Sequence, residues 1–285
     1  MPGMHGKTVL ITGASQGLGK ASAIALGRMG AKLVLVCRNP EWAKVAIADI
    51  KNESAAGAEI IIGDLASQAA VRRVAAEFKA KHDRLDVILN NAGTIVPSHR
   101  MTPDGIEETF AVNHVAYFLL TTLLLDMLKS SAPARIVNVS SEAHRRSKMH
   151  LDDLQFERSK YRSFTAYGRS KLCNILFTKE LAERLRGTKV TANCLHPGLV
   201  ASGFGRTHGG FMGLVIKLAH PFMITPEEGA KTQVWLASSP DIDGVSGKYF
   251  YKCAERASSK DAEDEADAHK LWEISEGLIR PFRET

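Results

Sequence analysis

The sequence has 285 residues, of which 45% are hydrophobic and 24% charged, and this composition is typical of a soluble globular protein with a sizeable core. The net charge is +6, but the basic residues are spread along the chain and an acidic run at 261–267 offsets them, so no nucleic-acid partner is expected. No apolar run approaches the length of a membrane span, and neither the cysteines nor the histidines show disulfide or metal-ligand spacing. With no room for a signal peptide before the first predicted strand, we expect a cytoplasmic protein without a membrane span or a metal site.

Strand-like apolar runs alternate with helical patterns along most of the chain. The predicted strands are 7–12, 32–37, 59–62, 87–90, 135–140 and 189–196, with a further edge strand at 248–251. The predicted helices are 17–29, 40–52, 67–82 with Ser67 as N-cap, 105–128, 164–186, 226–238 and 262–279. Strands joined by helices predict parallel crossovers, and therefore an α/β fold with one doubly wound, Rossmann-type parallel sheet in a single domain over residues 1–285.

Two segments interrupt the alternation. Residues 142–163 are polar and irregular, and their basic side chains fit a solvated loop better than a surface for an acidic substrate or a membrane. Residues 202–223 contain five glycines and several bulky apolar residues. They are predicted to form a substrate flap, although core packing or a subunit interface explains the same composition equally well.

The first predicted strand runs into the glycine-rich sequence TGASQGLG at 12–19, and a helix follows. Glycines permit a tight turn and let backbone N–H groups approach a pyrophosphate, while the helix N-terminus offers its positive end to the anion. A packed turn is the alternative, but the strand–loop–helix context favours dinucleotide binding. The expected contacts come from Gly13, Ser15, Gln16, Gly17, Leu18 and Gly19.

The end of the second strand indicates which dinucleotide is preferred. An acid at this place bonds the ribose 2′-OH of NAD, but here Cys37 and Arg38 occupy it. No carboxylate is present to repel a 2′-phosphate, and the guanidinium of Arg38 is suited to pairing with one. The sequence therefore favours NADP(H) over NAD(H), with an uninvolved surface arginine as the alternative.

Tyr167 and Lys171 are four residues apart and share one face of a predicted helix. A tyrosine alone, with a pKa of about 10, is a poor acid–base group at neutral pH. An adjacent ammonium, together with a cationic nicotinamide ring, is expected to lower that pKa. A surface pair without function is the alternative, because this spacing is common by chance.

The surroundings of this pair resemble the short-chain dehydrogenase/reductase family. The shared features are the TGxxxGxG loop, NNAG at 90–93, the serine pair at 140–141, and Asn113 in the preceding helix. The resemblance implies a catalytic tetrad made of Asn113, Ser141, Tyr167 and Lys171. In it, Ser141 would bind the substrate oxygen, Tyr167 would transfer the proton, Lys171 would tune Tyr167 and hold the nicotinamide ribose, and Asn113 would support a water that relays protons.

The resemblance also implies further cofactor contacts. Asp64 after the third strand would face the adenine, and the segment after the sixth strand would meet the nicotinamide carboxamide. The implied set is Asp64, Leu65, Asn91, Ala92, Gly93, Tyr167, Lys171, Pro197, Gly198, Val200 and Ser202. Most of these positions follow the carboxyl ends of strands, where ligands bind in open α/β sheets.

Ser141 and Tyr167 are 26 residues apart, about twice the spacing that is usual in the family. With the segments NHVAYFLLT, AYGRSKLCNILFTKEL and LHPG, this gap resembles the retinol-dehydrogenase-like branch over about residues 7–198. The resemblance implies a small lipophilic carbonyl or alcohol substrate and a homodimer or homotetramer. A catalytically quiet NADP(H)-sensing regulator or scaffold on the same fold is the alternative.

Overall fold

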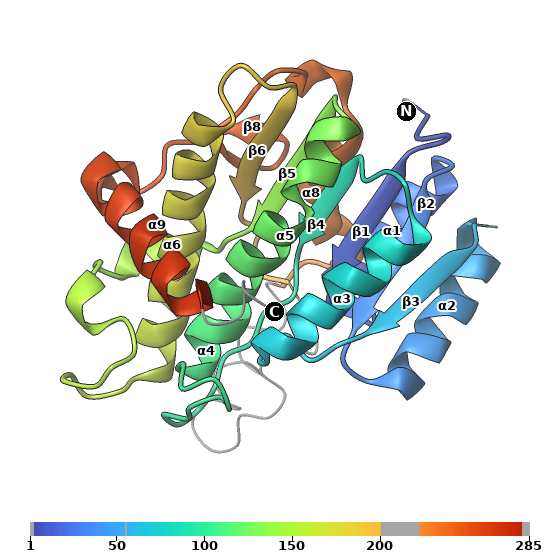
Figure 1. Cartoon of the computed structure of the whole chain (residues 1–285). Helices are drawn as coiled ribbons and strands as arrows, with labels where there is room; N and C mark the ends of the chain where they lie inside the picture. The colour runs from blue at the N-terminus through green and yellow to red at the C-terminus, as the bar shows by residue number, and fades with distance from the viewer. Residues whose placement is uncertain (1–2, 55, 201–222, 281–285) are drawn as a thin grey trace.

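The computed structural model describes residues 3–54, 56–200 and 223–280 (Figure 1). Over these residues the chain forms one sheet with the strand order β3-β2-β1-β4-β5-β6-β7-β8. All neighbouring pairs are parallel except β7 and β8, which are antiparallel. The strands are β1 (Thr8–Thr12), β2 (Lys32–Cys37), β3 (Ala58–Ile62), β4 (Val87–Asn90), β5 (Ala134–Val139), β6 (Val190–Leu195), β7 (Tyr249–Tyr251) and β8 (Ala254–Glu255). The predicted parallel α/β sheet is confirmed, but β7 is not its edge, because β8 pairs with it.

Helices cover both faces of this sheet, as a doubly wound fold requires (Figure 1). One face carries α1 (Gly17–Arg28), α2 (Pro40–Ser54) and α8 (Pro226–Ser238). The other carries α3 (Gln68–Lys81), α5 (Ala116–Ser130) and α6 (Ser163–Arg184), with α9 (Glu265–Ile279) packed on α6. Strands between two helical layers are buried on both sides, which explains why the central strands are almost continuously apolar.

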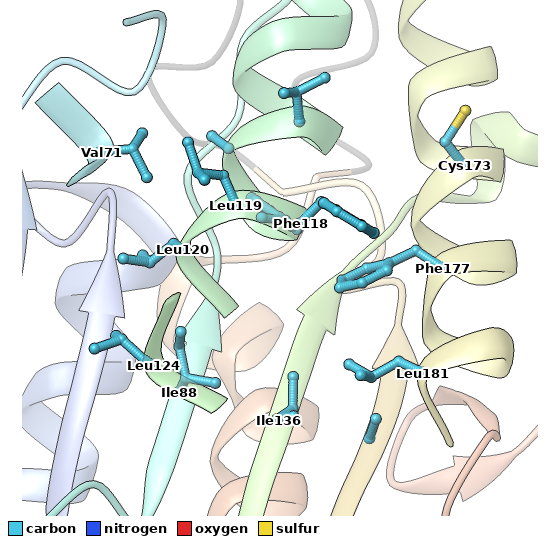
Figure 2. Packing of buried hydrophobic residues seen from close by; sticks show 14 of the residues in the cluster. Val71, Ile88, Phe118, Leu119, Leu120, Leu124, Ile136, Cys173, Phe177 and Leu181 are labelled. Atoms are coloured by element: carbon cyan, nitrogen blue, oxygen red, sulfur yellow. The ribbon is translucent and has the colours of Figure 1, made fainter. Parts of the chain in front are cut away.

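The larger core cluster lies between the sheet and the α3–α5–α6 layer. Figure 2 shows Leu124 of α5 beside Ile88 of β4, and Phe118 directed toward Phe177 of α6. The rings of Phe118 and Phe177 are 5.5 Å apart. This packing holds α5 and α6 at fixed positions over the strand ends that carry the polar residues.

The C-terminal helix α9 covers the outer side of the α5–α6 pair. Trp272 meets Phe118 edge-on at 4.8 Å and stacks on Phe177 at 6.0 Å between ring centroids. The guanidinium of Arg184 lies 4.2 Å from the centre of the Trp272 ring. Apolar and aromatic contacts of this kind dominate the energy of a packed helix, so α9 is an integral part of the fold.

The predicted helix at 105–128 differs from the observed one. It begins at Glu108 as a short helix α4 (Glu108–Phe110), passes through a π-helical turn η1 (Ala111–Val115), and continues as α5. The stretch Glu108–Ser130 is also long and apolar enough to cross a membrane, which contradicts the expectation that no run approaches that length. In the fold, 67% of the most apolar window of this stretch is buried, as in a core helix.

The segment at 142–163 is more ordered than its polar composition indicates. It contains the 3-10 turns η2 (Glu142–Arg146) and η3 (Leu151–Asp153). Tyr161 donates a hydrogen bond to the carbonyl of Val96 at 2.9 Å, and the side-chain oxygen of Gln155 accepts one from the backbone of Glu107 at 3.1 Å. These bonds fix the segment against the chain that joins β4 to α4.

Candidate active site

The glycine-rich loop packs tightly against the end of β4. Gly13 has a φ of +67°, and a Cβ there would lie 2.8 Å from the Cα of Ala92. A Cβ on Gly19 would lie 2.5 Å from the carbonyl oxygen of Gly13 and 2.6 Å from the side-chain amide of Asn91. Real Cβ atoms do not approach so closely, so both positions require glycine.

Helix α1 begins in this loop, and its own N-terminal residues do not compensate its partial positive charge. Its N-cap, Gln16, makes no side-chain capping bond, and the first turn has no acidic residue. A helix end of this kind offers N–H groups and a partial positive charge to an anion. The loop and the helix end therefore fit the pyrophosphate of a dinucleotide.

Thr12 links the glycine loop to the NNAG segment. Its hydroxyl accepts hydrogen bonds from the backbone of Asn91 at 2.9 Å and of Ala92 at 3.0 Å. The side chain of Asn91 donates to the carbonyl of Thr12 at 2.9 Å, and Gln233 of α8 donates to Asn91 at 3.3 Å. Asn91 and Ala92 thus lie beside the loop, and Gly93 follows them and is exposed.

The end of β2 lies beside the same loop. The buried thiol of Cys37 is hydrogen-bonded to Ser15, and burial raises the pKa of this thiol to about 11, so it is neutral. Arg38 is exposed, and its guanidinium forms no hydrogen bond or ion pair with any residue that the structure describes. Asp64 is also exposed and caps its own turn by accepting from the backbone of Ala66 at 3.0 Å, while Leu65 is buried.

Three members of the predicted tetrad meet where β5 ends. Ser141 begins the turn η2 and is hydrogen-bonded to Tyr167 of α6. The ammonium of Lys171 lies 5.8 Å from the centre of the Tyr167 ring and donates to the carbonyl of Val139 at 2.9 Å. The juxtaposition of Ser141, Tyr167 and Lys171 agrees with the sequence prediction.

Gly168 allows this close approach of α6 to η2. A Cβ at this position would lie 2.8 Å from the carbonyl oxygen of Ala143 and would overlap the hydroxyl of Ser147. Any larger residue would therefore push α6 away from the turn that carries Ser141. The glycine inside YxxxK is thus a structural requirement for the Ser141–Tyr167 hydrogen bond.

Burial controls the proton affinities of Tyr167 and Lys171. It raises the pKa of Tyr167 to about 12, with the Ser141 hydrogen bond acting in the opposite direction. It lowers the pKa of Lys171 to about 7. Without a cofactor, desolvation disfavours both charged forms, and the expectation that Lys171 and the nicotinamide ring together lower the pKa of Tyr167 stays a prediction.

Asn113 lies in the π-helical turn η1, a feature that is frequent at functional sites. Its side-chain oxygen accepts from the backbone of Thr94 at 2.7 Å, and its amide donates to the carbonyl of Thr94 and to the hydroxyl of Ser170, both at 2.9 Å. The side chain is thus already bonded to protein groups next to Lys171. It fixes the loop after NNAG against α6, and its predicted support of a water stays a prediction.

The turn after β6 lies next to the first turn of α8. Gly198 has a φ of +94°, and its backbone N–H donates to the side chain of His196 at 3.2 Å. A Cβ on Gly229 would lie 2.7 Å from Val200 and 2.8 Å from Leu18, so α8 begins against both the turn and the glycine loop. Pro197, Gly198 and Val200 therefore lie near the glycine loop, and their predicted contact with the nicotinamide stays a prediction, whereas Ser202 and residues 202–222 of the predicted flap lie outside the described residues.

Glu142 was not identified from the sequence, although it follows Ser141 directly. Its carboxylate lies 3.0 Å from Arg145, 3.3 Å from His196 and 3.4 Å from Arg256. The ring of His196 also stacks on Tyr251, with 4.1 Å between the centroids. Glu142 thereby links η2, which begins at Ser141, to the turn after β6. No local sequence motif predicts contacts between segments so far apart in the chain.

The sequence and the fold both match known proteins. The profile of the short chain dehydrogenase family matches residues 7–209. Human retinol dehydrogenase 14 is 46% identical, with 97% of this chain and 87% of that protein aligned. An uncharacterized protein from Mycobacterium paratuberculosis has a similar structure, with a TM-score of 0.80, 31% identity and coverage of 98% and 96% of the two chains. The RhlG protein of Pseudomonas aeruginosa, in a complex with NADP, has a TM-score of 0.70, 26% identity and coverage of 87% and 95%.

The family match covers more than half of the chain, and the residues that define the family lie together at one edge of the sheet. The chain therefore belongs to the short chain dehydrogenase/reductase family of oxidoreductases, in its retinol-dehydrogenase-like branch.

Proposed function

We propose that the protein is an NADP(H)-dependent oxidoreductase that interconverts a lipophilic ketone or aldehyde and its alcohol. The observation that best supports this proposal is the hydrogen bond between Ser141 and Tyr167. Lys171 lies on the same helix as Tyr167. These groups follow the carboxyl end of β5, at the same edge of the sheet as the glycine loop. That edge is where a dinucleotide and its substrate meet in this fold class.

Ser141, Tyr167 and Lys171 have different roles in the proposed proton transfer. The Ser141 hydroxyl donates a hydrogen bond to the substrate carbonyl oxygen, and Tyr167, protonated at neutral pH, gives its proton to the alkoxide that forms. Lys171 holds its ammonium beside the tyrosine ring and supports the loss of that proton. The cofactor, when bound, supplies or accepts the hydride. Oxidation of the alcohol uses the same groups in reverse.

The preference for NADP(H) is supported by the surroundings of β2. The exposed Arg38 offers a guanidinium beside the neutral thiol of Cys37, and a carboxylate is absent from both positions. A 2′-phosphate carries negative charge and several acceptor oxygens, which a guanidinium recognises well. The NADP in the related RhlG complex is consistent with this preference.

The lipophilic substrate class is supported by two exposed apolar side chains near the site. Phe164 lies one turn before Tyr167 and is 50% exposed, and Leu199 follows Gly198 and is 56% exposed. Such residues beside a catalytic group favour an apolar ligand. The names of the retinol dehydrogenase relatives point in the same direction.

The location and assembly of the protein are further proposals. We place it in the cytoplasm as a homodimer or homotetramer. Because α9 covers the outer side of α5 and α6, a subunit interface would have to use another surface or include α9 itself. Sedimentation at several protein concentrations measures the assembly directly.

A reductase assay tests the proposed activity. The purified chain is mixed with NADPH and either all-trans-retinal, an aliphatic aldehyde or a steroid ketone, and absorbance is followed at 340 nm. We expect NADPH consumption with at least one lipophilic carbonyl and slower consumption with NADH. Tight NADPH binding without turnover of any of them would instead support a cofactor-sensing regulator and overturn the proposal.

A further inference from the structure

The backbone carbonyl of Ser141 is held by two donors from one residue. It accepts from the backbone N–H of His144 at 3.1 Å, within the turn η2, and from Nδ1 of the His144 ring at 2.6 Å. The ring is fully buried, and Tyr249 of β7 meets it edge-on with 5.1 Å between the centroids. His144 therefore fixes the peptide group that follows the Ser141 side chain.

The other nitrogen of this ring binds the C-terminal part of the chain. Nε2 of His144 accepts from the backbone N–H of Ser259 at 3.2 Å, in the segment 256–259 that precedes η6 (Lys260–Glu263). A carbonyl can only accept and a backbone N–H can only donate, so Nδ1 must carry the hydrogen and Nε2 must be the acceptor. Burial lowers the pKa of His144, so the ring is neutral at pH 7, as this arrangement requires.

Neighbouring side chains fasten the same segment to η2. The guanidinium of Arg145 donates to the carbonyl of Ser258 at 3.2 Å, and Glu142 forms an ion pair with Arg256 at 3.4 Å. These charged side chains are partly exposed, so water can replace their contacts, whereas His144 is buried. Loss of a buried partner leaves polar groups without compensation, so the largest effect is expected from His144.

The conformation of this turn determines the contacts of the Ser141 hydroxyl. Its oxygen accepts from the backbone N–H of Ala143 at 3.2 Å, and the hydroxyl is also hydrogen-bonded to Tyr167. Ser141 has an extended backbone, with φ −158° and ψ 153°. If its carbonyl turned, the following peptide groups would turn with it, and the N–H of Ala143 would lose its alignment with the hydroxyl.

We propose that His144 is a positioning residue for Ser141, and that Ser259 sets the tautomer with which it acts. The inference rests on the proposed oxidoreductase function, because it gives His144 a role in aligning the Ser141 hydroxyl with Tyr167 and the substrate oxygen. It also makes the segment 256–259 a part of the site, although Ser259 is 115 residues from His144 in the chain.

A tautomer measurement tests the bonds of the ring without any cofactor or substrate. Long-range ¹H–¹⁵N NMR spectra of the histidine-labelled protein distinguish Nδ1–H from Nε2–H, and the signals that disappear in His144→Asn belong to His144. We expect a neutral Nδ1–H ring at pH 7. A neutral Nε2–H ring would direct a lone pair at the carbonyl of Ser141, and this result would overturn the proposal.

Kinetics test the consequence for Ser141. Leucine at 144 cannot donate, whereas the amide nitrogen of asparagine occupies a place similar to that of Nδ1 and can still donate to the Ser141 carbonyl. We expect kcat to fall about tenfold in His144→Leu, with little change in the KM for NADPH, and to stay within about twofold of the wild-type value in His144→Asn. Both variants lose the bond to Ser259, so their melting temperatures are expected to fall by similar amounts.

Hydrogen exchange at the backbone amide of Ala143 reports the same effect without turnover, because this N–H donates to the Ser141 hydroxyl. We expect exchange about tenfold faster in His144→Leu than in the wild type, and little change in His144→Asn. The control is Leu128→Ala, which removes buried packing in the last turn of α5, away from the site. It is expected to lower the melting temperature while kcat and the exchange of Ala143 stay near their wild-type values.

The outcomes separate this proposal from the proposed function. If the wild-type chain is active, full kcat in His144→Leu would overturn the positioning role, and so would a loss in His144→Asn as large as in His144→Leu. An equal loss of kcat in Leu128→Ala would reduce the effect to general stability and would also overturn it. A wild-type chain without turnover would refute the proposed function, and the exchange of Ala143 would then decide whether His144 holds Ser141.

Discussion

The site has two parts: the nucleotide side around the glycine loop and the catalytic side around α6. Charged groups are exposed on the first and buried on the second. Around the glycine loop, Arg38 and Asp64 are exposed, and the packing relies on backbone bonds and glycines. Around α6, Lys171 and His114 are buried, and desolvation moves the pKa of each far from its usual value. Exposed charge can meet a charged ligand at little cost, whereas buried groups gain the altered proton affinities that acid–base chemistry needs.

The largest effect is expected on the catalytic side. Tyr167→Phe removes the proton donor but keeps the ring, so turnover is expected to fall by at least about a hundredfold. NADPH binding, measured by fluorescence titration, should stay within about twofold, because the nucleotide side is untouched. Tyr161→Phe removes another hydroxyl outside the tetrad and serves as the control. Turnover of Tyr167→Phe near the wild-type rate would refute its role.

The nucleotide side is tested by Gly19→Ala. The added methyl would lie 2.5 Å from the carbonyl oxygen of Gly13, a backbone atom that cannot simply rotate away. The loop must shift, and overpacking of this kind costs about 1–3 kcal/mol, which corresponds to NADPH binding weakened by up to about a hundredfold.

The matched control for that substitution is Gly57→Ala. A Cβ at Gly57 would have no atom within 4 Å, so NADPH binding should not change. Isothermal titration with NADPH measures both variants. If Gly19→Ala bound NADPH as tightly as Gly57→Ala does, the glycine loop would not hold the pyrophosphate.

Features that depend on neighbouring residues are easier to predict from the sequence than features that depend on contacts between distant residues. The glycine loop and the Ser67 N-cap depend on neighbouring residues and backbone conformation, so local patterns predicted them. The roles of the NNAG segment and of the full tetrad were predicted only through family resemblance. Sequence reasoning missed the π-helical turn at η1 and the contacts of Glu142, because these depend on side chains that meet only after folding.

The pKa values of Tyr167 and Lys171 also show the limit of prediction from local sequence. From the sequence, a lysine beside a tyrosine favours the phenolate, since opposite charges attract. In the fold, both groups lose water, and this loss of hydration raises the pKa of Tyr167. Local spacing predicts which groups meet, whereas burial decides what their proton affinities become.

The preference for NADPH over NADH tests the role of the exposed charge at the end of β2. Arg38→Asp replaces an exposed cation by an anion, so the ratio of kcat/KM for NADPH to that for NADH is expected to fall by about tenfold, as the loss of a charge-assisted hydrogen bond predicts. Lys148→Asp makes the same change of charge on the exposed surface of the 142–163 segment and should leave the ratio unaltered. An equal ratio in both variants would assign Arg38 to the solvated surface.

The last contrast concerns stability at acid pH, where a buried histidine beside the catalytic side lowers it. Burial lowers the pKa of His196 to about 4, well below its unfolded value of about 6.5. The unfolded chain therefore binds more protons between these values, and the free energy of unfolding falls as the pH drops from 6.5 to 4. The difference corresponds to at most roughly 3 kcal/mol, or several degrees in melting temperature.

His196→Gln should flatten this acid dependence, whereas His150→Gln, at an exposed site, should not. His114 adds loss of the same sign below pH 6.5, so the His196→Gln variant keeps part of the slope. Thermal unfolding of the cofactor-free protein between pH 4 and 7 gives both slopes. If His150→Gln flattened the profile as much as His196→Gln does, the acid sensitivity would come from the net charge of the whole protein, and the buried ring beside Glu142 would have no special part in it.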